Sequence, residues 1–264
     1  MYTNRSYNID DIVRYSSNTK YSNNLNYFIS RSENYTNAME NNNNQIEYNN
    51  QQQRPIIYSR NNYLSNEDKP TRTYYFTPKI FLKPIRPLTQ FVDTTEQVIE
   101  FVDETFRVMF RKNLPKNISI NVCSKEELKQ IHSDFSLWNE GIQGFALNNK
   151  NIKQIFVKNN NLDELMLTIG HEIGHIYTNN LNNKHNEEAK AFSFALEWAK
   201  IIKKNNIANL AENIKDDLDF KPAKNGLHDL AFLFVKNLIN KGIKPMQIHW
   251  DLVKGYISLF NFYN

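Results

Sequence analysis

The sequence of 264 residues has little cysteine and little glycine, and it contains no long apolar run. Its single cysteine, Cys123, excludes a disulfide framework and any zinc site built from several thiolates. No stretch approaches the roughly 18 consecutive apolar residues of a membrane span, and residues 1–20 lack the apolar core of a signal peptide. These absences predict a protein of the cytoplasm or another intracellular compartment that has no membrane partner.

Composition divides the chain into two parts. All seven glycines lie at Gly141 or later, whereas 17 of the first 66 residues are asparagine and 11 of the 14 tyrosines precede Phe76. Residues 1–69 have few aliphatic side chains and no hydrophobic period, so burial cannot offset the entropy lost on ordering. We predict a disordered Asn/Tyr-rich tail there. Four prolines in residues 70–90 favour extended chain and predict a linker.

The excess of positive charge belongs to the first part of the chain. Residues 1–90 carry 11 Lys+Arg and 7 Asp+Glu, which accounts for the whole formal charge of +4. A nucleic-acid-binding domain is expected to concentrate basic residues on one face or stripe. The charge distribution therefore disfavours nucleic acid as a partner.

Regular structure is predicted from residue 94 onward. Hydrophobic periods of 3–4 residues predict seven helices: over 94–112, from 124, and over 162–178, 187–204, 207–218, 227–241 and 245–260. Alternating or apolar segments predict strands over 118–122, 145–147 and 152–158. Turn residues over 148–151 are expected to join the last two strands. Thr94 and Ser124 are the expected N-caps of the first two helices, each with a capping glutamine or glutamate three residues on. This order lacks βαβ alternation and predicts an α+β fold with a small mixed sheet. We predict one domain over residues 91–205 and a helical extension over residues 206–264 that packs on this domain.

One motif carries recognisable chemistry. His171 and His175 are the histidines of an H-E-x-x-H sequence inside a predicted helix. Residues i and i+4 lie about 40° apart around a helix, so both imidazoles can reach one metal ion. Glu172 lies one step round, where its carboxylate can act on water held by that ion. The motif predicts one catalytic Zn²⁺ with Glu172 as the general base.

A catalytic zinc site needs a third protein ligand. The metzincin spacing would require glycine and histidine where Thr178 and Leu181 stand, so that arrangement is excluded. The residues leave three candidates open: His185, Glu187 and Glu188.

A family resemblance narrows this choice. The segment from Gly170 to Ile176, followed by Glu-Ala-Lys-Ala-Phe-Ser from Glu188 to Ser193, resembles the ImmA/IrrE-type metallopeptidases, which are minimal gluzincins. The resemblance implies a zincin-like fold for residues 91–205, Glu188 as the third zinc ligand, and hydrolysis of an intracellular protein or peptide. Glu187 would point about 100° away from it on the helix. Ser193 departs from the small alanine usual in the family.

Two other functions remain open. A catalytically idle protein could retain the zincin fold and use the tail for binding or as a scaffold. A SprT-like protease associated with nucleic acid would use a third histidine followed by glycine, but His185 is followed by Asn186. The sequence does not indicate the oligomeric state.

Several further residues are candidates for a role in the site. Tyr177 and His185 are candidates for stabilising an oxyanion. The strand over 152–158, just before the motif helix, is a candidate edge strand that binds a peptide substrate by β-augmentation. Histidines on the other amphipathic helices are expected to be core or surface residues and not ligands: His132, His228 and His249.

Overall fold

The computed structural model describes residues 76–148, 153–216 and 227–259. The tail predicted over 1–69 lies outside this range, as does most of the turn predicted over 148–151. No described helix combines the length and the apolar character that a membrane crossing demands.

A three-stranded mixed sheet forms one layer of the fold. Its order is β2 (Ile118–Cys123), β4 (Lys153–Lys158) and β3 (Gly144–Asn148), with β4 parallel to β2 and antiparallel to β3. The predicted α+β class is confirmed. The predicted edge strand is wrong, because β4 is the central strand and both of its edges pair with neighbours.

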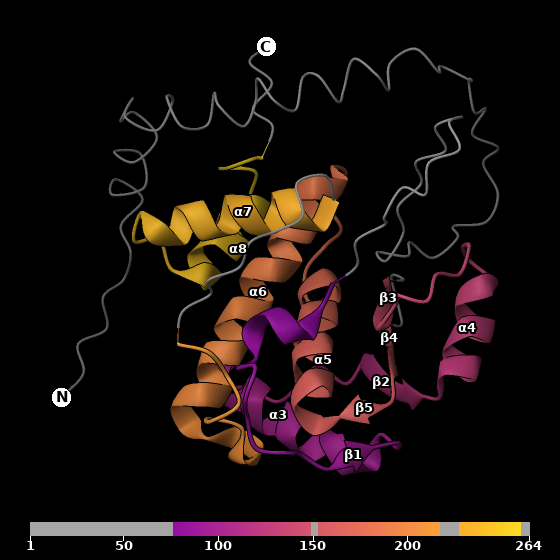
Figure 1. The fold of residues 1–264 in the computed structure, drawn as a ribbon. Helices are drawn as coiled ribbons and strands as arrows, with labels where there is room; N and C mark the ends of the chain where they lie inside the picture. Colours follow the sequence, from indigo (N-terminus) through magenta and orange to yellow (C-terminus); the bar gives the residue numbers. More distant parts are fainter. Residues whose placement is uncertain (1–75, 149–152, 217–226, 260–264) are drawn as a thin grey trace. The chain divides into compact units, whose positions relative to one another are not determined.

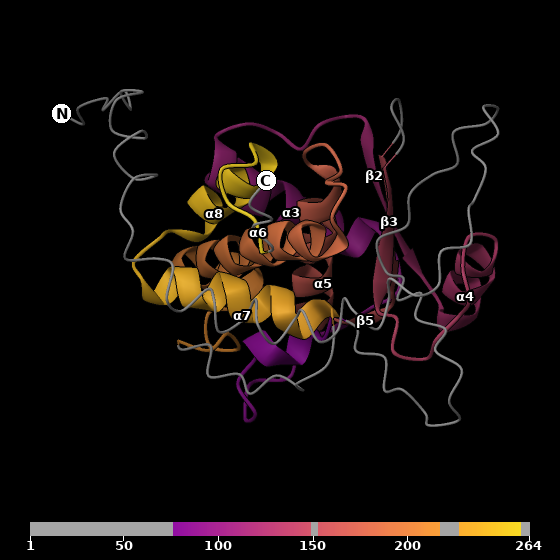
Figure 2. The ribbon, with the colours of Figure 1, turned by 90° about the horizontal axis from the view of Figure 1, so that it is seen from above.

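Helices cover both faces of this sheet. On one face, α4 (Lys125–Ser133) contributes Leu128 to an apolar cluster, in which the rings of Phe145 and Phe156 lie 5.2 Å apart. The other face packs on α5 (Leu162–Ile176), where a Cβ at Gly144 would lie 3.1 Å from the Thr168 side chain. The views in Figures 1 and 2 show α4, the sheet and α5 as successive layers.

The remaining helices surround α5 and α6. All of α5 is buried, and the long α6 (Lys184–Asn205) lies alongside it. Packed on α6 are α3 (Glu96–Phe110), α7 (Leu227–Asn240) and α8 (Pro245–Val253). As Figure 1 shows, α7 and α8 lie together on the side of α6 that faces away from the sheet. The helical extension therefore packs on the helix that follows the motif.

Helix boundaries follow local capping chemistry. The Ser124 capping box at the start of α4 is confirmed, with both reciprocal bonds to Glu127 present. The cap of α3 is Thr95, one residue later than predicted. Helix α6 begins earlier than predicted, because the Asn183 side chain accepts hydrogen bonds from two backbone N–H groups of the first turn.

The C-terminal helices are shorter than predicted. Instead of a helix over 207–218, the described chain to residue 216 has only a 3₁₀ turn, η3 (Ile207–Asn209), with left-handed backbone at Ala208. Helix α8 ends at Val253 and not at 260, and Gly255 then adopts a φ of 72° that favours glycine.

The described part of the proline-rich segment, from residue 76, is packed on the domain. It forms a 3₁₀ turn, η2 (Pro78–Phe81), where only extended chain was predicted. It continues into β1 (Phe91–Val92), which pairs with β5 (Asn160–Asn161) in a second small sheet. Between them, Arg86 binds two buried carboxylates in the first turn of α5. Residues 76–90 are thereby fixed against the start of the motif helix.

Candidate metal centre

Two glycines of α5 allow α5 and α6 to approach closely. A Cβ at Gly174 would lie 2.8 Å from the Cα atom of Ala191, and a Cβ at Gly170 would lie 2.4 Å from Cδ1 of Trp198. Both distances are far below ordinary contact. The approach brings the first turns of α6 against the part of α5 that carries His171 and His175.

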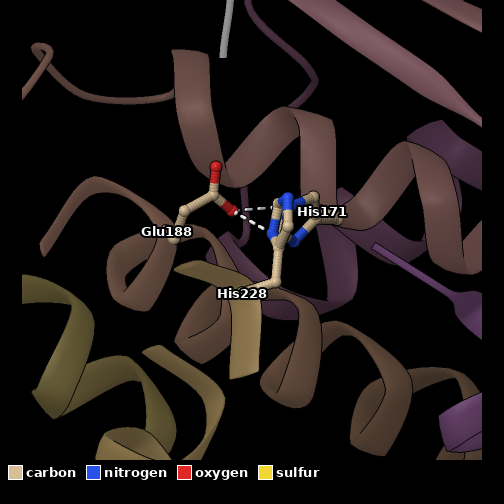
Figure 3. Close-up of side chains that lie close together, drawn as sticks. All are labelled: His171, Glu188 and His228. Carbon is tan, nitrogen blue, oxygen red and sulfur yellow. Dashed lines mark ion pairs between the residues drawn. The ribbon is translucent and has the colours of Figure 1, made fainter. Parts of the chain in front are cut away.

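A carboxylate oxygen of Glu188 lies at the centre of the candidate site. Its Oε2 atom is 3.5 Å from Nε2 of His171 and 3.8 Å from Nε2 of His175. A third imidazole comes from α7, where Nδ1 of His228 lies 2.8 Å from the same oxygen. Figure 3 shows the rings of His171 and His228 on the same side of the Glu188 carboxylate, with dashed lines for the two ion pairs. The ligand atoms of His171, Glu188 and His228 lie within 4.8 Å of one another.

The polar atoms of this group fit a bound cation. Within the described residues, Oε2 of Glu188 and Nδ1 of His228 are buried and have no hydrogen bond of acceptable geometry. Each such group costs about 1–3 kcal/mol when it is left unsatisfied. Imidazole nitrogens and a carboxylate oxygen are ligands of Zn²⁺. A cation would compensate the burial of this carboxylate.

Glu187 holds the opposite side of the His175 ring. Its Oε1 atom lies 3.0 Å from Nδ1 of His175 and 2.9 Å from Nζ of the buried Lys190, and its Oε2 accepts a hydrogen bond from the backbone N–H of Leu181. Lys190 also donates to the backbone carbonyls of His175 and Asn179. A carboxylate in this position fixes the orientation of a metal-binding histidine and raises its basicity.

An apolar enclosure sets the electrostatics of His171. The ring of Phe76 stacks on the His171 ring at 4.1 Å, and Phe192 contacts it at 5.0 Å. Burial lowers the pKa of His171 to about 3, so the imidazole is neutral, which is the form that binds metals.

The two motif-associated glutamates have opposite pKa shifts. Burial would raise the pKa of Glu188, but the imidazoles of His228, His175 and His171 outweigh it, and the net pKa is lowered. Burial dominates at Glu172 and raises the pKa of its carboxyl group to about 7. Glu188 is therefore ionised, whereas Glu172 exchanges a proton near neutral pH.

Comparisons with known proteins give no assignment. No protein-family model, curated protein or solved structure matches the chain.

The structure places the other candidate residues as follows. His185 lies in the first turn of α6, where burial lowers its pKa to about 4 and the charge of Glu188 acts in the opposite direction. Tyr177 instead packs its ring on Phe106 and Phe110, at 5.5 and 4.7 Å.

Three participants were not found in the sequence: His228, Phe76 and Lys190. No spacing rule links Phe76 to the motif, and His228 was expected to be an ordinary core or surface residue. Lys190, in contrast, lies three residues after Glu187 on the same helix, a spacing at which side chains can meet.

Proposed function

We propose that the chain is a zinc-dependent peptidase that hydrolyses a peptide bond of an intracellular protein or peptide. The observation that carries the proposal is the convergence of both H-E-x-x-H imidazoles on the carboxylate of Glu188, at 3.5 and 3.8 Å. This arrangement supports the resemblance to the minimal gluzincins, whose zinc is held by the same three residue types in the same order.

The residues in place suit a single Zn²⁺ ion. His171, His175 and Glu188 would be its ligands, and the Glu187 carboxylate would hold the His175 ring in a fixed orientation. A Zn²⁺ ion in this position would supply a Lewis acid that activates water and polarises a carbonyl group.

Glu172 would move the protons of the reaction. With a pKa raised to about 7, its carboxylate can accept a proton from the attacking water and then donate it to the leaving amine. The helix places Glu172 next to His171, about 100° round the axis, so it can reach water beside the imidazoles without replacing one of them.

The test compares two glutamate variants of the full chain on a library of fluorescence-quenched peptides. Glu172→Gln should reduce kcat/KM by about 10²–10⁴-fold, because a positioned acid–base group contributes that much, and should leave zinc content unchanged. Glu100→Gln, on the exposed side of α3, is the matched control and should retain parental activity. Full activity in Glu172→Gln, or parent protein without stoichiometric zinc, would contradict the proposal.

Burial of the site favours one alternative. His171, Glu172, His175 and Glu188 are each at most 4% exposed. An enclosed metal with no open position is typical of structural sites, so a zincin fold kept for binding is the second candidate. Stoichiometric zinc without hydrolysis of any peptide in the library would favour it.

A further inference from the structure

His228 contributes a third imidazole to a site for which the motif supplies two. It lies in the first turn of α7, and its side chain is 7% exposed. Its Nδ1 atom is 2.8 Å from Oε2 of Glu188, which is closer than either motif histidine.

The contact is not an ordinary histidine–carboxylate hydrogen bond. The two atoms are within hydrogen-bond distance, yet neither makes a hydrogen bond of acceptable geometry within the described residues. Two buried polar atoms this close to each other are therefore left unsatisfied, and they belong to a group of side chains close enough together to hold an ion. A cation there would satisfy both.

Packing fixes α7 in this position. Phe232, one turn after His228, contacts Phe192, one turn after Glu188, with ring centroids 5.4 Å apart. One turn of α7 therefore lies on one turn of α6, with an apolar pair beside the polar pair. His228 is held at Glu188 by the helix and not by a mobile side chain alone.

We propose that His228 is a fourth protein ligand of the metal. In the conformation of this structure, α7 would then occupy the coordination position that catalysis needs open. The inference rests on the proposed function and adds its regulation. Four protein ligands are typical of a closed zinc site, whereas catalysis needs an open position. Substrate or a partner must therefore displace His228 from the ion before hydrolysis can begin.

The decisive variant is His228→Cys, loaded with Co²⁺ in place of Zn²⁺. A thiolate bound to Co²⁺ produces an intense sulfur-to-metal charge-transfer band in the near ultraviolet. The parent protein should lack this band, because its single cysteine, Cys123, is buried in the apolar cluster between the sheet and α4. The matched control is His132→Cys, since His132 is also buried but packs on Phe145, on the α4 side of the sheet. The band should appear in His228→Cys alone.

A second pair of measurements does not depend on that variant. X-ray absorption at the zinc edge of the parent protein should count three imidazoles, and His228→Ala should count two. His228→Ala should weaken Zn²⁺ binding at least about tenfold, since even residues that only support a ligand cost that much. Added imidazole should restore the affinity, and without imidazole the peptidase activity should rise above that of the parent.

The outcomes separate the two proposals. If Co²⁺ binds to His228→Cys without a charge-transfer band, or if the parent zinc has two imidazoles, His228 is not a ligand and the peptidase proposal stands. If the parent protein binds neither ion, both proposals fail. If His228→Ala loses zinc affinity but imidazole does not restore it, His228 acts through folding, and the closed centre is refuted.

Discussion

The glycine of the motif, Gly174, makes the geometry of the site testable through Gly174→Ala. A Cβ there would lie 2.8 and 2.9 Å from the Cα and O atoms of Ala191, and 2.9 Å from Cβ of Phe194. The first two atoms belong to the backbone of α6. A change of rotamer cannot relieve the clash, so the two helices must move apart.

The cost follows from these distances. Carbon atoms in contact lie about 3.5–4.0 Å apart, so α6 must shift by about 0.7 Å. Over-packing of a core costs about 1–3 kcal/mol, and a rigid backbone favours the upper end. Alanine regains about 1 kcal/mol of helix propensity over glycine. We expect the free energy of unfolding to fall by about 2 kcal/mol, which lowers Tm by about 4–8 °C.

The same shift of α6 should also weaken metal binding. His171 and His175 are carried by α5 and Glu188 by α6, so separation of the helices changes the distances between ligands. Metal sites tolerate deviations of about 0.2 Å. Zn²⁺ affinity, measured by competition with a chelator, should fall at least about tenfold.

Two double-mutant cycles test the cause. Ala191→Gly should not rescue Gly174→Ala, because the clashing atoms are backbone, so the coupling energy should stay below about 0.5 kcal/mol. At Gly170 the clash is with the Trp198 side chain, so Trp198→Leu should relieve Gly170→Ala by more than about 1 kcal/mol. A Gly174→Ala protein with unchanged Tm and zinc affinity would refute the reasoning.

Two further predictions concern buried charges. Glu187→Gln should weaken Zn²⁺ binding about 10–100-fold, because His175 loses its orienting carboxylate. It should also lower the free energy of unfolding by about 3 kcal/mol, because Lys190 stays buried without its charged partner. The double variant Glu187→Gln/Lys190→Met should regain stability in denaturant unfolding, but its Zn²⁺ affinity in a chelator titration should stay low. Recovery of both the stability and the affinity would contradict the role of Glu187 in orienting His175.

Burial would raise the pKa of Asp163, but Arg86 and Asn213 outweigh it and the net pKa is lowered. This stabilisation is present above the ordinary carboxyl pKa and is lost as the pH falls through the lowered value. Asp163→Asn should therefore lower the free energy of unfolding by about 2 kcal/mol at pH 7 and by progressively less in acid, as measured by denaturant unfolding at several pH values. A difference that does not change with pH would count against the ion pair.

Local sequence signals predicted the elements that carry the motif. The apolar period over 162–176 and the capping box at Ser124 each act within a few residues, and both are present in the structure. The two-residue strands β1 and β5 were missed, because each is too short to show alternation. The helix over 207–218 was predicted from its hydrophobic pattern, but left-handed backbone at Asn206, Ala208 and Asn209 interrupts it.

Tertiary packing, in contrast, determines the rest of the site. His228 begins an apolar helix that is also consistent with an ordinary core position, and only the packing of α7 on α6 brings it to Glu188. Phe76 precedes the motif by almost a hundred residues and is placed by the turn η2 and the Arg86 ion pairs. Such residues carry no local signal, because their roles depend on contacts between elements distant in the chain.

Glu187 shows how a correct geometric premise led to an incomplete conclusion. Adjacent residues on a helix do point about 100° apart, and the sequence therefore suggested that only one of the two glutamates could serve the histidines. An imidazole, however, has nitrogens on two sides of its ring. Glu188 lies 3.8 Å from Nε2 of His175, and Glu187 lies 3.0 Å from Nδ1 of the same ring. The angular offset between the two glutamates is thus what allows one helix to contact both sides of a single histidine.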